Sequence, residues 1–233
     1  MSYNEEETIE QLKTWWQRYG TPALLTVAVV LLSFSGWRYW NTSKLESATK
    51  AQALQQQMSS AMQRVSINAE DKAANTDVQR LGRQLIDEYA STPYAVDAAL
   101  LLAKRAVDSG DLAAAEKQLR TALTLKPSAE VKLLVQSRLA RVLAARKQYP
   151  EALAILDDAG ADAAPLVAEI RGDILLLQDQ RDAAAKAHAT ADAALAKRDE
   201  ARPVLDLKLA EVGLTPAKRA SDVATEASAE VQP

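Results

Sequence analysis

The chain offers few side chains that could perform catalysis or hold a metal. His188 is the only histidine among 233 residues, and the sequence contains no cysteine. A histidine acting as a general base needs a nucleophile within hydrogen-bond reach, and no nucleophile motif accompanies His188. It falls instead where a helical repeat places a large packing residue. We therefore expect His188 to be a packing residue, buried or partly exposed.

Neighbouring carboxylates are the second candidate for chemistry. The pairs Asp87-Glu88 and Asp157-Asp158 are adjacent in sequence, and adjacent residues on a helix point in different directions. They predict solvated or helix-end charges rather than an acid and a base acting together. No phosphate-binding loop, nucleophile elbow, zinc-protease or dinucleotide-binding motif occurs. The sequence thus predicts a protein that is not an enzyme, with no catalytic residue, metal, cofactor or small-molecule substrate.

The amino-acid composition excludes further classes of partner and binding site. Lys and Arg number 28 against 31 Asp and Glu, for a formal net charge of -3. Such a chain has no basic field for nucleic acid, so no nucleic-acid partner is expected. The absence of cysteine excludes disulfides and thiolate metal sites. Aromatic residues make up only 5% of the chain, so its soluble part is expected to pack through Ala and Leu.

An uncharged run from Tyr19 to Trp37, bracketed by Arg18 and Arg38, predicts a transmembrane helix. About 20 helical residues cover the roughly 30 Å hydrocarbon core of a bilayer. Aromatic side chains favour the headgroup level, and they gather at both ends of this run. The lipid bilayer is therefore the first predicted partner. The residues expected to anchor the chain at its interfaces are Trp15, Trp16, Tyr19, Trp37, Arg38, Tyr39 and Trp40.

A cleaved signal peptide is the main alternative to an anchor. Ser33-Phe34-Ser35 places small residues as a cleavage site requires. A signal peptide begins with a short basic segment, however, whereas the leader here is long and contains Glu5, Glu6, Glu7 and Glu10. These residues favour retention of the segment. A secreted soluble binding module, released after Ser35, remains the alternative.

The charges flanking the run leave its orientation open. Lys13 and Arg18 lie on one side, against Arg38, Lys44 and Lys50 on the other. Cytoplasmic flanks carry an excess of Lys and Arg, so a count of two against three slightly favours a cytoplasmic C-terminal side. The margin is small, and long domains are translocated largely regardless of charge. A cytoplasm-facing adaptor therefore remains a second alternative.

The part after the apolar run is expected to begin with a polar, Gln-rich stalk helix over Ser43–Val65. The stretch Asn68–Thr76 lacks a consistent apolar period and is predicted to be a loop. A second helix is predicted near Asp77–Ala90, where apolar residues recur at helical spacing. Ser91-Thr92-Pro93 ends it, because the residue before proline resists helical geometry.

The next hundred residues show a degenerate repeat of the tetratricopeptide kind, a helix-turn-helix unit of about 34 residues. Val96–Pro127 forms the first copy, with Gly110-Asp111 as the turn between its two helices. The equivalent small residues of three copies, Ala115, Ala152 and Ala184, stand 37 and 32 residues apart. Loop lengths are therefore expected to differ from copy to copy.

These elements predict an all-α protein in which a single N-terminal transmembrane helix precedes a tetratricopeptide-like α-solenoid. Arg202–Val212 is expected to cap the last helical pair, as the ends of solenoids require. The composition beyond Gly213 predicts disorder. The expected parts are an N-terminal segment (1–18), the transmembrane helix (19–40), a stalk helix and loop (41–75), the repeat domain (76–212) and a disordered tail (213–233).

Tetratricopeptide repeats bind peptides or protein surfaces along a concave face, which the first helix of each pair lines. Lys104 and Arg141 on this face would favour an acidic partner segment. The residues expected on the partner-binding face are Leu100, Lys104 and Asp108 from the first copy, Ser137 and Arg141 from the second, and Glu169 and Asp173 from the third.

Three stretches of this sequence resemble the YfgM family. They are Gly36-Trp37-Arg38-Tyr39-Trp40-Asn41 after the apolar run, Tyr89-Ala90-Ser91-Thr92-Pro93-Tyr94-Ala95 before the repeats, and Ile170-Arg171-Gly172-Asp173-Ile174-Leu175-Leu176 in the third copy. The resemblance covers essentially the whole chain except the tail beyond Gly213. Proteins of this family are ancillary subunits of the SecYEG translocon in Gram-negative bacteria.

The resemblance implies a single-pass inner-membrane protein with a cytoplasmic N-terminal segment and a periplasmic repeat domain. It also implies association with the SecYEG translocon and with the membrane-anchored periplasmic chaperone PpiD. The implied role is to help newly exported proteins reach periplasmic chaperones. The family has no catalytic residues to transfer to this chain. On orientation we follow the resemblance rather than the charge count.

Overall fold

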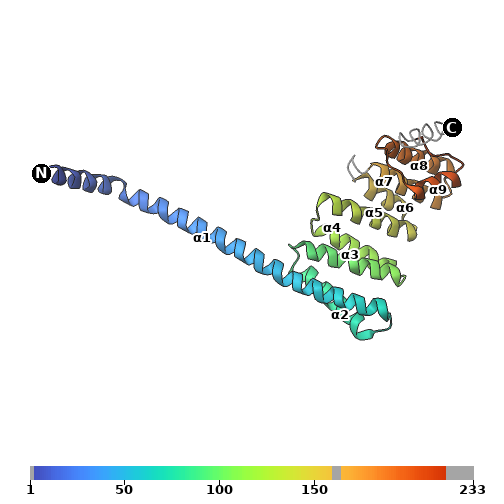
Figure 1. Ribbon diagram of the computed structural model, residues 1–233, viewed down its shortest axis with the longest axis horizontal. Helices are drawn as coiled ribbons and strands as arrows, with labels where there is room; N and C mark the ends of the chain where they lie inside the picture. The colour runs from blue at the N-terminus through green and yellow to red at the C-terminus, as the bar shows by residue number, and fades with distance from the viewer. Residues whose placement is uncertain (1–2, 159–163, 219–233) are drawn as a thin grey trace, which may run out of the picture. The chain divides into compact units, whose positions relative to one another are not determined.

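The computed structural model describes residues 3–158 and 164–218, which form α-helices joined by short turns (Figure 1). No strand occurs in these two ranges, and the predicted all-α class is confirmed. In the first helix the side chains of residues 3–12, 14, 17–25, 27, 28, 39 and 43 lie outside the described part, as does that of residue 164.

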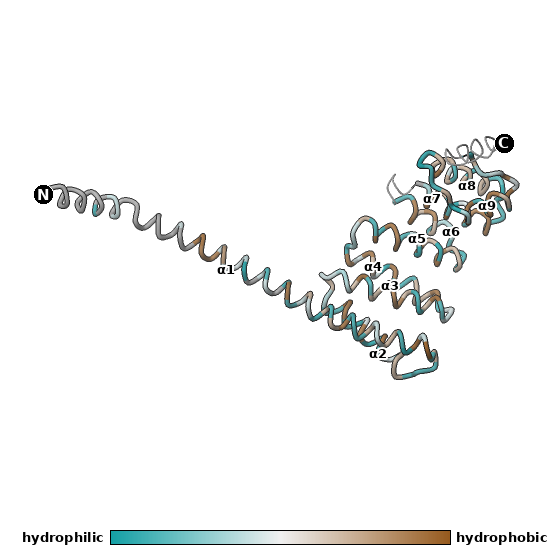
Figure 2. The backbone as a smooth tube through the Cα atoms, viewed as in Figure 1, coloured by the Kyte–Doolittle hydropathy of each residue, from teal (hydrophilic) through white to brown (hydrophobic). Residues whose placement is uncertain are grey.

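The helices follow one another as α1 (Tyr3–Ile67), α2 (Lys72–Glu88), α3 (Pro93–Asp108), α4 (Leu112–Thr124), α5 (Ala129–Ala145), α6 (Tyr149–Asp157), α7 (Ala164–Leu177), α8 (Arg181–Ala196) and α9 (Pro203–Glu211). The chain divides into two compact units, Met1–Ala53 and Leu54–Pro233. The first unit holds most of α1. Hydrophobic and hydrophilic residues alternate in short stretches along the helices of the second unit (Figure 2).

The first unit carries exposed apolar side chains. Those of Val29, Leu32 and Phe34 are each more than half exposed, and Leu32 reaches 73%. Among the residues whose placement is described, no helix combines the length and the apolar character needed to cross a bilayer.

The last turns of α1 belong to the second unit and pack against α2. Met58 and Ala61 are buried there. The Nη2 atom of Arg64 lies 3.0 Å from Oδ2 of Asp77 on α2. Residues 54–67, predicted as part of a stalk, thus form a helical pair with α2.

The loop expected over Asn68–Thr76 is shorter than predicted, because α2 begins at Lys72. Asp71 is the N-cap, and its side chain accepts a hydrogen bond of 2.9 Å from the backbone N–H of Ala74. Such a cap satisfies an amide that the first helical turn would leave unpaired. The boundary expected between residues 75 and 76 therefore falls inside a helix.

The first helices of the three predicted copies, α3, α5 and α7, end in the same backbone turn. Gly110, Lys147 and Asp179 have φ angles of 79°, 62° and 60°. In each turn the next backbone N–H bonds to the carbonyl five residues earlier, which is the hydrogen bond of a Schellman motif. These turns stand 37 and 32 residues apart, as the alanines do. The predicted repeat register is therefore confirmed.

Small residues let the paired helices cross closely. Ala115, Ala152 and Ala184 are fully buried. One turn later on the second helix of each pair stand Leu119, Leu156 and His188, which are also buried. The sequence-based expectation that His188 is a packing residue is confirmed.

The predicted cap over the last pair is α9. Its Leu205 and Leu209 are buried and pack with Ala191 and Leu195 of α8. Residues 214–218 follow α9 without helical structure. The remainder of the tail predicted to be disordered, residues 219–233, lies outside the described residues.

Candidate functional site

A groove lies between α3 and α5, the first helices of two successive pairs. Its volume is about 310 Å³, and Leu119 of α4 contributes to its lining. A second hollow of about 430 Å³ shares Leu100, Lys104 and Arg138 with it and extends to Met62 at the end of α1. Because the two hollows share these residues, they form one continuous surface, here called the α3–α5 groove.

Three of the seven residues predicted to face a partner line this groove, namely Leu100, Lys104 and Arg141. Leu100 belongs to the apolar floor and is only 9% exposed. Asp108 is exposed and accepts a hydrogen bond of 2.6 Å from Lys104 Nζ. The first helices thus bring Leu100 and Lys104 of the first copy together with Arg141 of the second.

The other predicted partner-facing residues lie elsewhere. Ser137 is 3% exposed, and its hydroxyl donates a hydrogen bond of 2.8 Å to the carbonyl of Leu134. Glu169 is equally buried. The Lys208 Nζ atom lies 2.7 Å from Glu169 Oε1 and 2.8 Å from Asp173 Oδ2. Glu169 and Asp173 therefore hold α9 against α7 and offer little surface to a partner.

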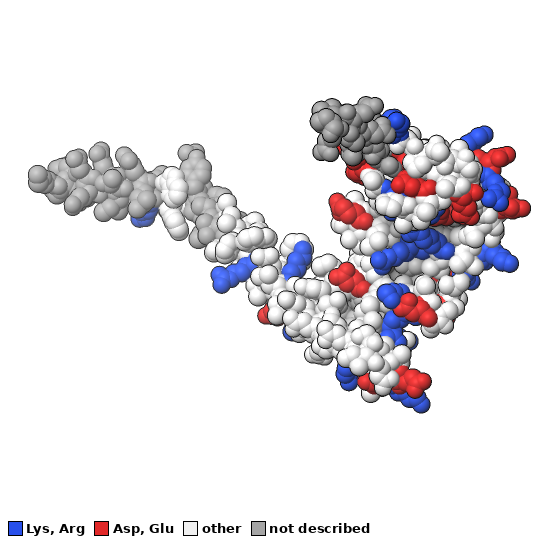
Figure 3. Space-filling model, turned by 45° about the vertical axis from the view of Figure 1, so that its right-hand side comes forward, with Lys and Arg blue, Asp and Glu red and all other residues white. Residues whose placement is uncertain are grey.

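The groove carries free positive charge. Neither Arg138 nor Arg141 has an ion pair or a hydrogen bond from its side chain to another described residue. Sequence reasoning missed Arg138, although it precedes Arg141 by three residues and so shares its helix face. Figure 3 shows Lys and Arg side chains gathered in the middle of one face of the second unit.

One carboxylate, that of Asp97, lines the groove as well. Burial raises the pKa of this carboxyl group above its ordinary value. The cause is desolvation, which disfavours the charged form. Two free guanidinium groups therefore outweigh Asp97, so the groove suits an acidic segment with apolar side chains.

The described residues provide no arrangement for catalysis or metal binding. His188 is fully buried, and its Nε2 atom lies 3.3 Å from Asp173 Oδ1 with no nucleophile beside it. No group of three or more His, Cys, Asp or Glu side chains in the described part of the chain could hold a metal ion.

The predicted interface residues of the membrane anchor lie in the first unit. Trp15, Trp16, Trp37 and Trp40 are 50% to 60% exposed, and Arg38 is exposed as well. The side chains of Tyr19 and Tyr39 lie outside the described residues.

Paired helices of repeating register define a tetratricopeptide repeat-like protein. The family model described as a tetratricopeptide repeat-like domain matches residues 13–214. No solved structure gives a significant match to the chain.

Curated relatives identify the particular family. The ancillary SecYEG translocon subunit of Haemophilus influenzae is 31% identical over 184 residues, which cover 78% of this chain and 86% of the relative. The protein of the same name from Escherichia coli is 30% identical over 185 residues, or 79% and 85% of the two chains. That of Neisseria gonorrhoeae is 24% identical over 206 residues, or 88% and 95%. The chain belongs to this YfgM family of tetratricopeptide repeat-like proteins.

Proposed function

We propose that this chain is a membrane-anchored interaction scaffold at the Sec translocon that helps pass exported proteins to periplasmic chaperones. The relatives are named for the SecYEG translocon, and the repeats are of a kind that binds protein segments. The observation that carries the proposal is the α3–α5 groove. Its apolar floor and two free arginines fit a partner segment that is both apolar and acidic.

The anchor in this proposal is the run from Tyr19 to Trp37. Its support is the exposure of Val29, Leu32 and Phe34 along one helix. Transfer of apolar side chains from water to hydrocarbon is favourable by about 25 cal/mol per Å². The headgroup level is likewise a favourable environment for indole rings, and Trp37 and Trp40 would lie there.

We place the N-terminal segment, residues 1–18, in the cytoplasm and the repeat domain in the periplasm, on either side of the inner membrane. Anchoring confines the domain to a thin layer near the membrane. This confinement raises its effective concentration toward the translocon and toward a membrane-anchored chaperone such as PpiD without any new contact. A scaffold of this kind needs no catalytic residue.

Orientation and retention can be tested with reporters fused after Pro233. Alkaline phosphatase folds only in an oxidising compartment, so an active fusion is expected, together with an inactive cytoplasmic fluorescent reporter. The opposite pair of results would favour the cytoplasm-facing adaptor. The mass of the mature protein is expected to include residues 1–35, and a protein shortened to begin after Ser35 would favour the secreted module.

The groove can be tested by photocrosslinking in cells. A photoreactive amino acid is placed at Val107, which lines the groove and is 43% exposed. The matched control carries it at Thr190, an exposed residue of α8. We expect crosslinks from Val107 to translocon subunits or to a periplasmic chaperone, and none of these from Thr190. Equal yields from both positions would contradict the assignment of the groove.

A further inference from the structure

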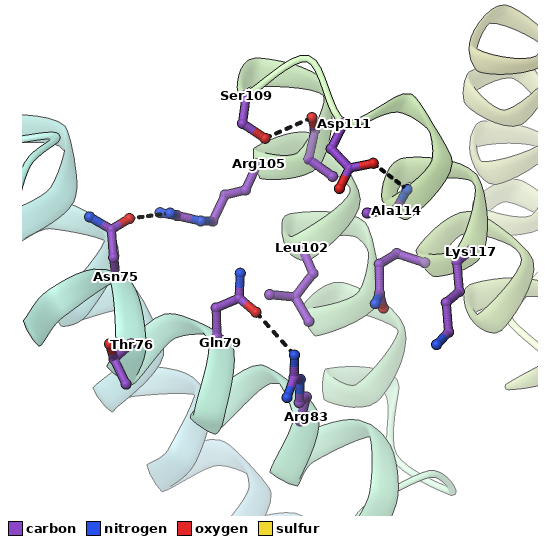
Figure 4. A pocket seen from close by; sticks show the side chains of 12 residues that line it. Asn75, Thr76, Gln79, Arg83, Leu102, Arg105, Ser109, Asp111, Ala114 and Lys117 are labelled. Atoms are coloured by element: carbon purple, nitrogen blue, oxygen red, sulfur yellow. Dashed lines mark hydrogen bonds between the residues drawn. The ribbon is translucent and has the colours of Figure 1, made fainter. Parts of the chain in front are cut away.

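A second hollow, the α2–α4 cleft, lies where α2 meets α3 and α4 (Figure 4). Its volume is about 730 Å³, and it shares no lining residue with the α3–α5 groove. The side chains that define its chemistry are Asn75, Gln79, Arg83, Arg105, Asp111 and Lys117. Nothing in the proposed function uses this surface.

Arg105 at the end of α3 is half-buried without a carboxylate partner among the described residues. One guanidinium nitrogen, Nη2, donates a hydrogen bond to Oδ1 of Asn75, and Nη1 lies 3.8 Å from the sulfur of Met62. The Nε atom is buried and has no acceptor in the described part of the chain. A guanidinium withdrawn from water is normally matched by a carboxylate or a phosphate. The cation of Arg105 is therefore uncompensated.

Two further cations surround the same cleft. Arg83 of α2 is exposed, and its single described contact is a hydrogen bond of 3.4 Å to Gln79 Oε1. Lys117 of α4 is also exposed and has no ion pair with a described residue. Figure 4 shows Arg83, Arg105 and Lys117 arranged around one hollow, each from a different helix.

A single carboxylate, that of Asp111, is present in this lining. It is already engaged as the N-cap of α4, accepting a hydrogen bond of 2.9 Å from the Ala114 N–H. Three cations against one carboxylate leave a lining with two uncompensated positive charges. The cleft thus presents a positive field that the described residues do not neutralise.

We propose that the α2–α4 cleft binds an acidic peptide segment of a partner protein, as a second surface beside the groove. Two carboxylates of such a segment would balance the charge of the lining, and arginine pairs with carboxylates in a planar, bidentate manner. The amides of Gln79 and Gln118 both donate and accept, so they can pair with a peptide backbone. A cleft of about 730 Å³ also leaves ample room for several residues.

The test uses the full-length chain in a non-ionic detergent and fluorescence anisotropy at low salt. The probe is a fluorescein-labelled ten-residue peptide of alternating Glu and Gly, and the comparison peptide has Gln in place of Glu. We expect the Glu peptide to bind and the Gln peptide to bind weakly or not at all. Binding is expected to weaken as salt is added, because exposed charges are screened.

Three variants locate the peptide. The exposed double variant Arg83→Gln/Lys117→Gln is expected to weaken binding about fivefold, as loss of two surface ion pairs predicts. Arg105→Gln is expected to weaken it about tenfold or more, since a charged hydrogen-bonding group is lost. The control Lys186→Gln/Lys197→Gln removes two exposed charges, one on α8 and one at its C-cap, outside the cleft, and is expected to bind normally.

The double variant keeps the test decisive even if Arg105→Gln fails to fold, because Arg83 and Lys117 are both exposed. A groove variant, Arg138→Gln/Arg141→Gln, separates this proposal from the proposed function. If it abolishes binding while the cleft variants bind normally, the peptide lies in the groove and the cleft proposal is overturned. Binding of inorganic phosphate without binding of the Glu peptide would also overturn it, in favour of a phosphate site.

Discussion

The imidazole of His188 fills the space that a side chain at position 172 would occupy. A Cβ atom built on Gly172 would lie 3.0 Å from Cγ of His188 and closer still to Cδ2 and Nε2. The repeat register aligns this pair with Ala103 and Leu119 in the first copy and with Ala140 and Leu156 in the second. The third copy therefore has a glycine and a flat imidazole ring where the other copies have an alanine and a leucine.

This exchange predicts that Gly172→Ala destabilises the protein by about 2 kcal/mol or more, because overpacking a filled core forces strain. Adding His188→Leu recreates the Ala and Leu pair of the other copies. The double variant is expected to recover part of this loss, because the imidazole ring that would meet the new Cβ atom is gone. Urea unfolding of the three proteins measures both effects.

A matched control is Gly82→Ala. The added Cβ would meet Cε of Met58 at 2.9 Å, and that atom is the end of a flexible side chain. A cost well below that of Gly172→Ala is expected, because the end of the Met58 side chain can move aside. The gain of about 1 kcal/mol in helix propensity is common to both changes. Equal losses in the two variants would refute the account of the pair of Gly172 and His188.

Removal of Lys208 is expected to loosen α9. In Lys208→Met the carboxylates of Glu169 and Asp173 lose a partner within 2.8 Å, and Glu169 is 3% exposed. Breaking a buried ion pair on one side costs about 3 kcal/mol. Hydrogen exchange should show faster opening of the α9 amides, with the amides of α3 unchanged.

Lys197→Met, at the exposed C-cap of α8, serves as the control for this variant. The double variant Lys208→Met/Glu169→Gln is expected to lose less than Lys208→Met alone, because it also removes the buried Glu169 charge, whose Oε1 atom would otherwise lose its partner. Arg202, which lies 3.0 Å from Glu169 Oε2 and is 40% exposed, can then be solvated by water. Additive losses would argue that Lys208 acts by packing alone.

Asp77 links the end of α1 to α2 in a pH-dependent way. The side-chain hydrogen bond from Arg80, and next that from Arg64, lowers the pKa of Asp77 below its ordinary 3.8. A lowered folded-state pKa contributes stability that is present above pH 3.8 and is lost as the pH falls through the lower folded value. Asp77→Asn should therefore lower the melting temperature at neutral pH, with the difference disappearing in strong acid.

Asp87→Asn, an exposed change on the same helix, is the control for this titration. A melting-temperature difference for Asp77→Asn that stays constant from neutral pH to strong acid would contradict the linkage.

The pKa of Asp97 is shifted in the opposite direction to that of Asp77. Burial raises the pKa of its carboxyl group, so the charged form is unfavourable in the folded protein at neutral pH. We expect Asp97→Asn to raise the melting temperature at neutral pH, and this gain to shrink as the pH falls through the raised pKa. Loss of a negative charge from the groove should also strengthen crosslinking from Val107.

Reversing the charge of the two groove arginines tests whether they select the partner. Arg138→Glu/Arg141→Glu is expected to reduce the Val107 crosslinks severalfold, because like charges across an interface repel an acidic segment. The exposed pair Lys186→Glu/Lys197→Glu, on α8 and at its C-cap, provides the same change of charge outside the groove. Unchanged crosslinking in the groove variant would show that its arginines do not select the partner.

The sequence by itself determined the helical class, the repeat register and the packing role of His188. It could do so because these features depend on local chemistry. Small residues recur at a fixed distance from each turn, as Ala115 and Ala152 do five residues after Gly110 and Lys147. Asp71 could have revealed the true start of α2, since a capping residue is a local signal as well.

Only the tertiary structure decided which surfaces the helices leave open. Helical spacing put Ser137 and Glu169 on the partner-facing side, yet Ser137 turns inward and Glu169 is covered by Lys208 of α9. Periodicity indicates which residues share a face of one helix. Whether that face is buried depends on another helix, which can be distant in sequence. The same reason explains why Arg105 and Arg83, from different helices, meet in one cleft that no local pattern predicts.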